Sequence, residues 1–519
     1  MTKSIVLQME GIRKVFGTVV ALDDVNLQLN SKEIHGLLGG NGAGKTTLMN
    51  VLFGLYKPNA GKVELHGEKV EIRSPKDAIN NEIGMVHQHF LQVDSYTVTE
   101  NIVLGTELKS WPTLKLEVEA DQIRALSEKF GLAVDPDTIM SDLPIGVRQK
   151  VEILKALYRG VEVLILDEPT TNLTPQEVDD LFESLRVMVD EGLSIVFITH
   201  KLREVMSVCD KITVLRDGQN VLTEDRENVT EKSLVKAMVG EGLNVEESVV
   251  FSSVVSGAET RWGASEFGEP VVKVEGLHAQ NEDSIVVIKD CTFEVRQKEI
   301  LGVAGVAGNG QQALAECLMG VCPIHQGSVI VDGMNVSETE TRDLLEGGVA
   351  YIPQDRLLDG FLPTASVAHN LILGYQRNQA YSNKGFLDWK IIFQSARQQI
   401  DEYTIMTPSA GDVAANLSGG NIQRVMLARA FAHPSSFLIA HNPTRGLDIR
   451  SIDFVYKKLF ERKEAGAATL LISEDLDELF RMCDRIATIY SGEIVGILEK
   501  GEFDKYEIGR MMSGVKAND

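Results

Sequence analysis

The sequence is poor in cysteine and tryptophan and lacks any long apolar run. It has five Cys and three Trp among 519 residues. Because the cysteines are odd in number and form no CxxC pair, the sequence argues against a disulfide framework or a zinc ribbon and predicts buried, reduced thiols. No stretch of about 18 apolar residues could cross a bilayer, and the N-terminal segment MTKSIVLQMEGIRK lacks the apolar core of a signal peptide. We therefore expect a protein of a reducing cytoplasm that reaches a membrane only through partner subunits.

Basic residues are also scarce. The chain has 51 Lys and Arg against 75 Asp and Glu, which gives a formal net charge of −24. A field of that sign repels phosphate backbones, so we expect no nucleic acid among the partners. The remaining composition, 44% hydrophobic and 24% charged, is that of an ordinary globular protein, and the length suits roughly three or four structural units.

The chain contains an internal repeat. The segment LGGNGAGKTT at 38–47 returns in altered form as AGVAGNGQQ at 304–312, an offset of 266 (311 − 45). Further along, Leu143 of LPIGVRQ matches Leu417 of LSGGNIQ, an offset of 274 (417 − 143). A single net insertion of 8 residues between Gln354 and Leu417 explains the change of offset. Chance similarity would not keep this register, so the chain is a tandem repeat.

Each copy has the pattern of an α/β domain. The segment 270–277 repeats the pattern of 5–12, so the second copy begins near residue 270. The apolar runs 161–166 and 194–198 are typical of central parallel strands, and 175–191 has the spacing of one helical face. The alternation predicts a doubly wound α/β fold, present twice. We expect a first domain at 1–245, a linker at 246–269, a second domain at 270–512 and a tail at 513–519.

A phosphate-binding motif lies in the first copy. The segment 39–46 fits G-x-x-x-x-G-K-[ST], and it follows an apolar strand at 34–38 and precedes a helical pattern at 47–53. A glycine-rich loop alone can also be a tight turn, but this context favours a phosphate cradle in which Lys45 reaches the β- and γ-phosphates and the Thr46 hydroxyl ligates Mg²⁺. The residues expected to contact the nucleotide are Gly39, Gly40, Asn41, Gly42, Ala43, Gly44, Lys45, Thr46 and Thr47.

Further residues favour hydrolysis of the bound nucleotide. Asp167 and Glu168 end an apolar strand, where Asp167 can hold Mg²⁺ through water and Glu168 can polarise an attacking water. His200 ends the next apolar run and is placed to reach a γ-phosphate. Gln88 carries the least weight by itself, because a Gln in a loop is ordinarily just solvated.

Together with LSGGNIQ at 417–423, these residues resemble the ATP-binding cassette family over roughly 5–512. The resemblance implies two cassettes, each with a P-loop NTPase core and a helical subdomain, that face head to tail. Each ATP would lie between the P-loop of one cassette and the signature of the other. It further implies that Gln88 contacts the metal and the attacking water, and that Phe16 stacks on adenine, although Phe16 could instead be a core residue. On the opposing cassette the implied contacts are Ser418, Gly419, Gly420, Asn421 and Asp448.

The two copies depart from the family pattern at different motifs. In the first copy only the signature is damaged, by Pro144 and Ile145. In the second copy the P-loop and its acidic partners are replaced, by Gln311, Gln312, His441, Asn442 and Glu474. Head-to-tail pairing collects every defect in one composite site and leaves the other intact. The sequence therefore predicts one competent ATP site.

Two cassettes fused on one chain, the first intact and the second degenerate, resemble the ATPase subunit of bacterial importers for sugars and nucleosides. The segments 85–90, 151–160 and 305–311 look most like the nucleoside branch. The resemblance implies ATP and Mg²⁺ as cofactors, two integral membrane permease subunits, an extracytoplasmic solute-binding protein, and a peripheral position on the cytoplasmic face of the membrane. A monosaccharide importer of the ribose or galactose type is the alternative. A soluble fused-cassette translation factor fits less well, since such proteins have two intact sites, a long charged linker and basic segments.

Overall fold

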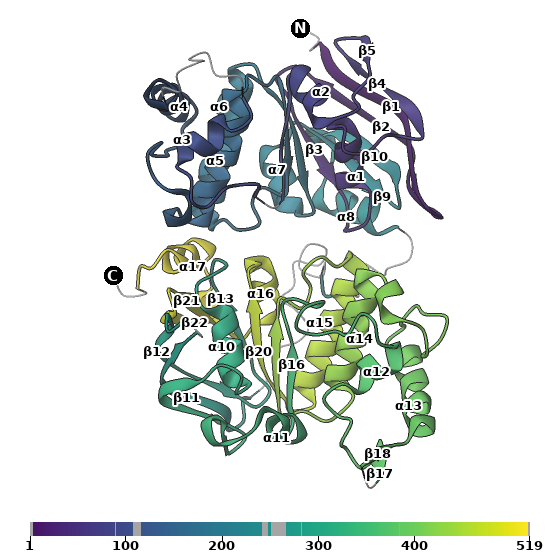
Figure 1. Cartoon of the computed structure of the whole chain (residues 1–519), viewed down its shortest axis with the longest axis vertical. Coiled ribbons are helices and arrows are strands. Elements are labelled where there is room, and N and C mark those ends of the chain that lie inside the picture. Colours follow the sequence, from purple (N-terminus) through teal and green to yellow (C-terminus); the bar gives the residue numbers. More distant parts are fainter. Residues whose placement is uncertain are drawn as a thin grey trace. The chain divides into compact units, whose positions relative to one another are not determined.

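A computed structural model describes residues 4–88, 90–106, 116–240, 248–250, 266–281, 283–383 and 385–516 (Figure 1). By their internal contacts the residues form two compact units, Met1–Glu247 and Ser248–Asp519, and each is described by itself. Most of the expected linker, and the end of the expected tail, lie outside the described residues. Residues 248–250 pack in the second unit, where the Ser248 hydroxyl and the Val249 N–H both donate to the buried carboxylate of Asp453 (2.9 and 2.7 Å).

The first unit contains two sheets. The antiparallel one has the order β2-β1-β4-β5, formed by β1 (Ile5–Phe16), β2 (Val19–Asn30), β4 (Ala60–Leu65) and β5 (Glu68–Val70). The larger one has the order β10-β9-β3-β8-β7-β6, formed by β3 (Ile34–Leu38), β6 (Ile83–Val86), β7 (Val163–Asp167), β8 (Ser194–Thr199), β9 (Lys211–Arg216) and β10 (Gln219–Asp225). Its strands pair in parallel except for the antiparallel β9–β10 edge. Strands β3, β7 and β8 are buried along their whole length, as their apolar sequences predict.

The helices of the first unit fall into two groups. Some cover the larger sheet, and others contact one another beside it. The helices are α1 (Lys45–Leu52), α2 (Pro75–Asn80), α3 (Val98–Val103), α4 (Leu116–Phe130), α5 (Ile145–Tyr158), α6 (Pro175–Asp190), α7 (Leu202–Val208) and α8 (Glu231–Val239). Helices α3, α4 and α5 contact one another, and Figure 1 shows them on the side of the unit away from β1 and β2. Helix α6 begins at Pro175, where Thr174 and Glu177 form a capping box that satisfies its first N–H groups. This arrangement matches the expected core with a helical subdomain.

The second unit repeats this topology. One sheet has the order β12-β11-β14-β15, formed by β11 (Pro270–Gln280), β12 (Val286–Arg296), β14 (Ile324–Val331) and β15 (Met334–Asn335). The other has the order β16-β19-β20-β13-β21-β22, formed by β13 (Ile300–Ala304), β16 (Val349–Ile352), β19 (Phe437–His441), β20 (Ala468–Ser473), β21 (Arg485–Tyr490) and β22 (Glu493–Glu499). Read from β22, this is the strand order of the first unit. The predicted doubly wound α/β fold, present twice, is confirmed.

The helices of the second unit also follow the first. They are α10 (Gln311–Leu318), α11 (Thr341–Glu346), α12 (Val367–Ile372), α13 (Trp389–Glu402), α14 (Gly419–Phe431), α15 (Ile449–Glu464), α16 (Leu476–Met482) and α17 (Lys505–Met512). A small hairpin of β17 (Ser382–Asn383) and β18 (Phe386–Leu387) lies in the stretch where the sequence comparison places the net insertion.

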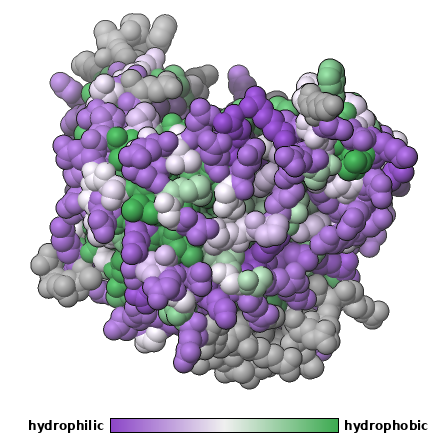
Figure 2. Space-filling view, turned by 90° about the horizontal axis from the view of Figure 1, so that it is seen from below, coloured by the Kyte–Doolittle hydropathy of each residue, from purple (hydrophilic) through white to green (hydrophobic). Residues whose placement is uncertain are grey.

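The surface and the cysteines can be compared with what the composition predicts. On the face shown in Figure 2, hydrophilic residues predominate around a smaller hydrophobic area. None of the described helices is both long and apolar enough to span a bilayer. All five cysteines are free thiols, and only Cys322 is not fully buried, which agrees with the expectation of buried, reduced thiols.

Candidate functional site

The glycine-rich loop of the first unit joins β3 to α1, and its glycines are required by its shape. Gly42 and Gly44 have φ of 79° and 101°, in the left-handed region that side chains disfavour. A Cβ added at Gly39 would lie 2.4 Å from the carbonyl oxygen of Leu215. At Gly40, by contrast, no described atom lies within 4 Å of an added Cβ, so this side of the loop is open. The loop therefore has a crowded inner side and a free outer side.

Positive charge is concentrated inside this loop. Lys45 is only 6% exposed, and its Nζ donates to the carbonyl oxygens of Gly39 (2.8 Å) and Gly40 (3.0 Å). Burial lowers the pKa of Lys45, and the charges of Glu168 and Asp167 oppose that shift. In the described residues, α1 has neither a side-chain cap nor an acidic residue in its first turn. Its first N–H groups are therefore left for an anion, and the loop fits a phosphate chain.

Asp167 and Thr46 lie together beside the loop. Asp167, at the end of β7, is 3% exposed, and the Thr46 side chain lies close enough to lower the pKa of its carboxylate. Burial raises the pKa of Asp167 to about 6; the charge of Glu168 adds to the shift, while Thr46 and Lys45 oppose it. The described chain contains no group of three or more His, Cys, Asp or Glu suited to a metal. A hydroxyl and a carboxylate beside a phosphate loop fit Mg²⁺, which uses one or two protein oxygens and takes its other ligands from phosphates and water.

Three residues predicted separately meet at one carboxylate. Glu168 Oε2 accepts a hydrogen bond from Gln88 Nε2 at 2.8 Å, and Glu168 Oε1 lies 2.9 Å from His200 Nδ1. Burial pushes the pKa of Glu168 upward, but the hydrogen bond and charge of His200, with the charges of Lys45 and Lys201, hold it below its ordinary value. Glu168 also has a φ of 49°, a left-handed conformation that is typical of constrained functional positions. The geometry presents an ionised, oriented base.

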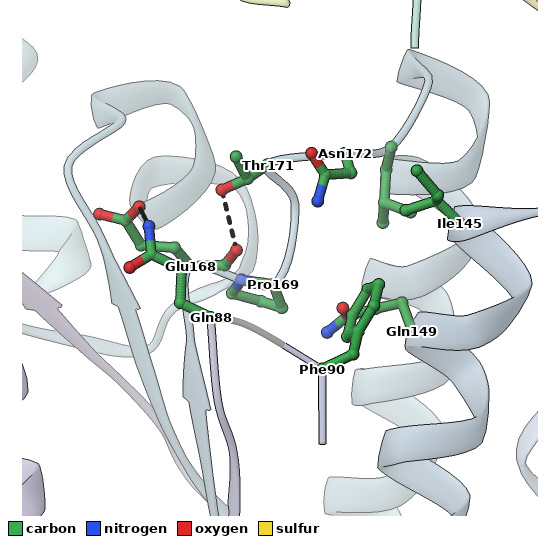
Figure 3. A pocket seen from close by; sticks show the side chains of 9 residues that line it. Gln88, Phe90, Ile145, Gln149, Glu168, Pro169, Thr171 and Asn172 are labelled. Atoms are coloured by element: carbon green, nitrogen blue, oxygen red, sulfur yellow. Dashed lines mark hydrogen bonds between the residues drawn. The ribbon is translucent and has the colours of Figure 1, made fainter. Parts of the chain in front are cut away.

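A pocket extends from this carboxylate (Figure 3). It lies between the segment after β7 and the start of α5, and the Thr171 hydroxyl on its wall donates to the Glu168 carbonyl oxygen at 3.0 Å. Sequence analysis did not single out several of its lining residues, although most of these lie within five positions of Gln88 or Glu168. The lining residues are Gln88, Phe90, Ile145, Gln149, Glu168, Pro169, Thr171, Asn172 and Leu173.

Phe16 lies on the surface with a partner that the sequence did not reveal. Its side chain is 41% exposed at the end of β1, so the alternative that it is a core residue is wrong. The ring of Tyr56 meets it edge-on, with centroids 5.1 Å apart. Lys14 Nζ lies 4.8 Å from the Phe16 ring centroid and 5.7 Å from that of Tyr56. Two aromatic rings and a cation thus form one exposed surface suited to a flat, electron-rich ring.

The corresponding loop of the second unit keeps the backbone but loses the charge. Gln311, 6% exposed, donates from Nε2 to the carbonyl oxygen of Val306 at 3.0 Å, so an amide makes one of the contacts that Lys45 makes. Gln312 bonds Glu316 of its own helix at 2.8 Å. Val306 corresponds to Gly40 by the same offset of 266. A branched side chain therefore stands where the first loop has open space beside a glycine. Sequence analysis missed this third defect, which direct alignment of the two loops could have found.

The acidic centre of the second unit is replaced by neutral groups. His441, 2% exposed at the end of β19, has its pKa lowered to about 4 by burial and by the charge of Arg445. Asn442 keeps the left-handed φ (47°), but its Oδ1 accepts from the Glu474 N–H at 3.2 Å. Glu474 in turn accepts from Gln354 at 3.5 Å. The fold is retained, while the carboxylate that corresponds to Glu168 is replaced by the Asn442 amide.

The LSGGN segment begins α14 with an exposed turn that Asn421 holds by hydrogen bonds. Asn421 donates to the Ser418 hydroxyl at 2.9 Å and accepts from the Met406 N–H at 2.8 Å. Asp448 caps α15 by accepting from the N–H and hydroxyl of Ser451, and its carboxylate lies 3.8 Å from a Cβ built at Gly420. These contacts place five residues next to one another: Ser418, Gly419, Gly420, Asn421 and Asp448.

Comparisons with known proteins identify the family of this chain. The model of the ABC transporter family matches residues 22–171 and 288–445. Nucleoside import ATP-binding protein NupA of Lactococcus lactis is 39% identical, with 100% of both chains covered. Guanosine import ATP-binding protein NupO of Bacillus subtilis is 40% identical over 98% of this chain and 97% of its own. Glucose import ATP-binding protein TsgD13 of Haloferax volcanii is 37% identical over 99% and 96%. The chain belongs to the ABC transporter family and carries two of its ATP-binding cassettes in tandem.

Proposed function

We propose that this protein is the ATP-hydrolysing subunit of a nucleoside importer. Two relatives that match nearly its whole length carry the names of nucleoside and guanosine import ATP-binding proteins, and this supports the solute class. Two integral membrane permease subunits would hold the protein at the cytoplasmic face of the membrane, and an extracytoplasmic solute-binding protein would deliver the solute. A monosaccharide importer is the second candidate, because a glucose import relative is 37% identical.

The observation that carries the proposed hydrolysis is the bonded set Gln88–Glu168–His200. ATP would place its phosphates in the loop of residues 39–47, against Lys45 and the N-terminus of α1, with Phe16 and Tyr56 beside the adenine. Thr46 and Asp167, with Gln88, would hold Mg²⁺, which supplies neutralising charge to the phosphates. Glu168, ionised and oriented from both sides, would take the proton of the attacking water, and His200 would donate to the γ-phosphate.

The site would be completed by the second unit. We infer that Ser418, Gly419, Gly420 and Asn421, with Asp448 beside them, close over the γ-phosphate held in the first unit. The distribution of defects supports this pairing, since every replaced group of the second unit would face the damaged signature at Pro144 and Ile145. Linking both cassettes on one chain raises the effective concentration for closure.

The test uses the protein reconstituted in vesicles with its permease subunits and binding protein. ATP hydrolysis and uptake are measured with adenosine, guanosine, ribose, galactose and glucose. We expect nucleosides to be taken up and to stimulate ATP hydrolysis. A complex with Glu168→Gln should neither hydrolyse ATP nor take up solute. Uptake of monosaccharides alone would replace the nucleoside assignment by the second candidate. Absence of ATP hydrolysis with every solute would overturn the function itself.

A further inference from the structure

A buried carboxylate outside the bonded set joins the two segments that carry Glu168 and His200. Glu204 lies in the first turn of α7 and is 7% exposed. Its Oε1 accepts a hydrogen bond from the Thr170 hydroxyl at 2.5 Å, and its Oε2 accepts one from the Thr199 hydroxyl at 2.7 Å. Both threonines are buried as well, 3% and 2% exposed. One carboxylate therefore uses both oxygens to tie two segments that are far apart in sequence.

These segments are the ones on which the proposed chemistry depends. Thr170 follows Glu168 by two residues, and Thr199 directly precedes His200. The Thr199 hydroxyl also accepts from the Lys201 N–H at 3.0 Å, so it fixes the backbone on both sides of the histidine. Loss of either threonine hydroxyl would remove one of the bonds that hold the two members of the 2.9 Å contact between Glu168 and His200 in place.

We propose that Glu204 is a positioning residue that holds Glu168 and His200 in register for hydrolysis. This inference rests on the proposed function. Glu204 acts through the two threonine hydroxyls, and its bonds lie on the buried side of the β7 and β8 ends. The loop of residues 39–47 contributes none of these bonds among the described residues, so we expect their loss to affect hydrolysis more than nucleotide binding.

The second unit contains the same bridge around a centre without a base. Glu478, 1% exposed, accepts from the Thr444 hydroxyl at 2.7 Å and from the Ser473 hydroxyl. Thr444 follows Asn442 by two residues, and Ser473 precedes Glu474. Glu478 is thus a control matched in its two hydroxyl bonds, and its loss disturbs no catalytic carboxylate. Glu204 differs in that its Oε1 also lies 3.5 Å from Lys201 Nζ.

The experiment compares Glu204→Gln with Glu478→Gln in the reconstituted transporter. A glutamine keeps the shape, but its amide nitrogen is a donor and cannot accept the second hydroxyl bond. We expect Glu204→Gln to lower kcat about 10-fold or more with KM for ATP within about twofold, because displacement of catalytic groups costs rate rather than nucleotide binding. Glu478→Gln should leave kcat within about twofold of the wild type, while both variants show similar shifts of the thermal midpoint.

A second pair of variants tests the same proposal if Glu204→Gln fails to fold. Thr170→Ser keeps the hydroxyl and should retain kcat, whereas Thr170→Val removes it and should lower kcat as Glu204→Gln does. Unchanged kcat in folded Glu204→Gln, or equal losses in Glu204→Gln and Glu478→Gln, would overturn the positioning role. A wild-type complex that does not hydrolyse ATP would instead overturn the proposed function.

Discussion

At the scale of single residues, we expect turnover to depend most on the Glu168 carboxylate. Replacing Glu168 by Gln keeps its size but removes the charge that we propose accepts the proton of water. We expect ATPase activity to drop by about 10²-fold or more, the scale of a lost general base, with ATP still bound. The measurement is steady-state hydrolysis with parallel nucleotide binding. Glu71→Gln, at an exposed carboxylate of the same unit, is the control, and equal activity of the two variants would remove Glu168 from the mechanism.

The pKa of Asp167 predicts how the magnesium requirement changes with pH. Because burial raises this pKa to about 6, the carboxyl group becomes protonated as the pH falls below 6, well above the usual range for Asp. A protonated Asp167 is a poor ligand, so the Mg²⁺ concentration for half-maximal activity should rise about tenfold between pH 7 and pH 5.

Magnesium titrations at several pH values check this prediction. Asp167→Asn should require more Mg²⁺ at every pH and lose the pH dependence, since the amide does not titrate in this range. A wild-type magnesium requirement that stays constant from pH 7 to pH 5 would contradict the assignment of Asp167.

At the scale of elements, the strand–loop–helix of residues 34–52 offers a position where a substitution should weaken ATP binding without destabilising the fold. Gly40 has open space where a side chain would go, whereas Gly39 does not. We therefore expect Gly40→Val to fold with a thermal midpoint near that of the wild type and to bind ATP at least about tenfold more weakly, because the side chain fills the phosphate cradle. Val306→Gly in the second unit is the control and should leave hydrolysis unchanged. Normal ATP affinity in Gly40→Val would show that phosphates do not lie on this side of the loop.

At the scale of the whole molecule, the two units should contribute unequally to hydrolysis. Lys45→Ala removes the buried cation of the first loop, and Ser418→Arg places a bulky cation in the signature proposed to close over the same nucleotide. Both should abolish ATPase activity of the assembled transporter. Gln311→Ala should retain most activity, because that loop already lacks its lysine. If folded, assembled Gln311→Ala is as inactive as Lys45→Ala, the proposal of one competent site is wrong.

Much of this protein follows from local sequence patterns. The repeat, the buried strands and the phosphate loop could be predicted because each depends on neighbours in sequence: an apolar run that ends at Leu38, glycines at fixed spacing, and a helix that begins at Lys45. The loss of charge in the second copy was equally visible, since Gln311 and His441 are read directly from the alignment of the two halves.

Tertiary structure decided which of these residues meet. Gln88 and Glu168 are 80 residues apart, and Thr170 and Glu204 are 34 apart, yet each pair shares a hydrogen bond. Likewise, only the folded chain brings Tyr56 against Phe16. For the two hydrogen-bonded pairs, the physical reason is the parallel order β3-β8-β7-β6, which gathers the carboxyl ends of strands from distant parts of the chain at one edge of the sheet. Sequence alone determined the chemistry available to this protein, and strand order determined which groups could act together, because hydrogen bonds form between neighbours in space.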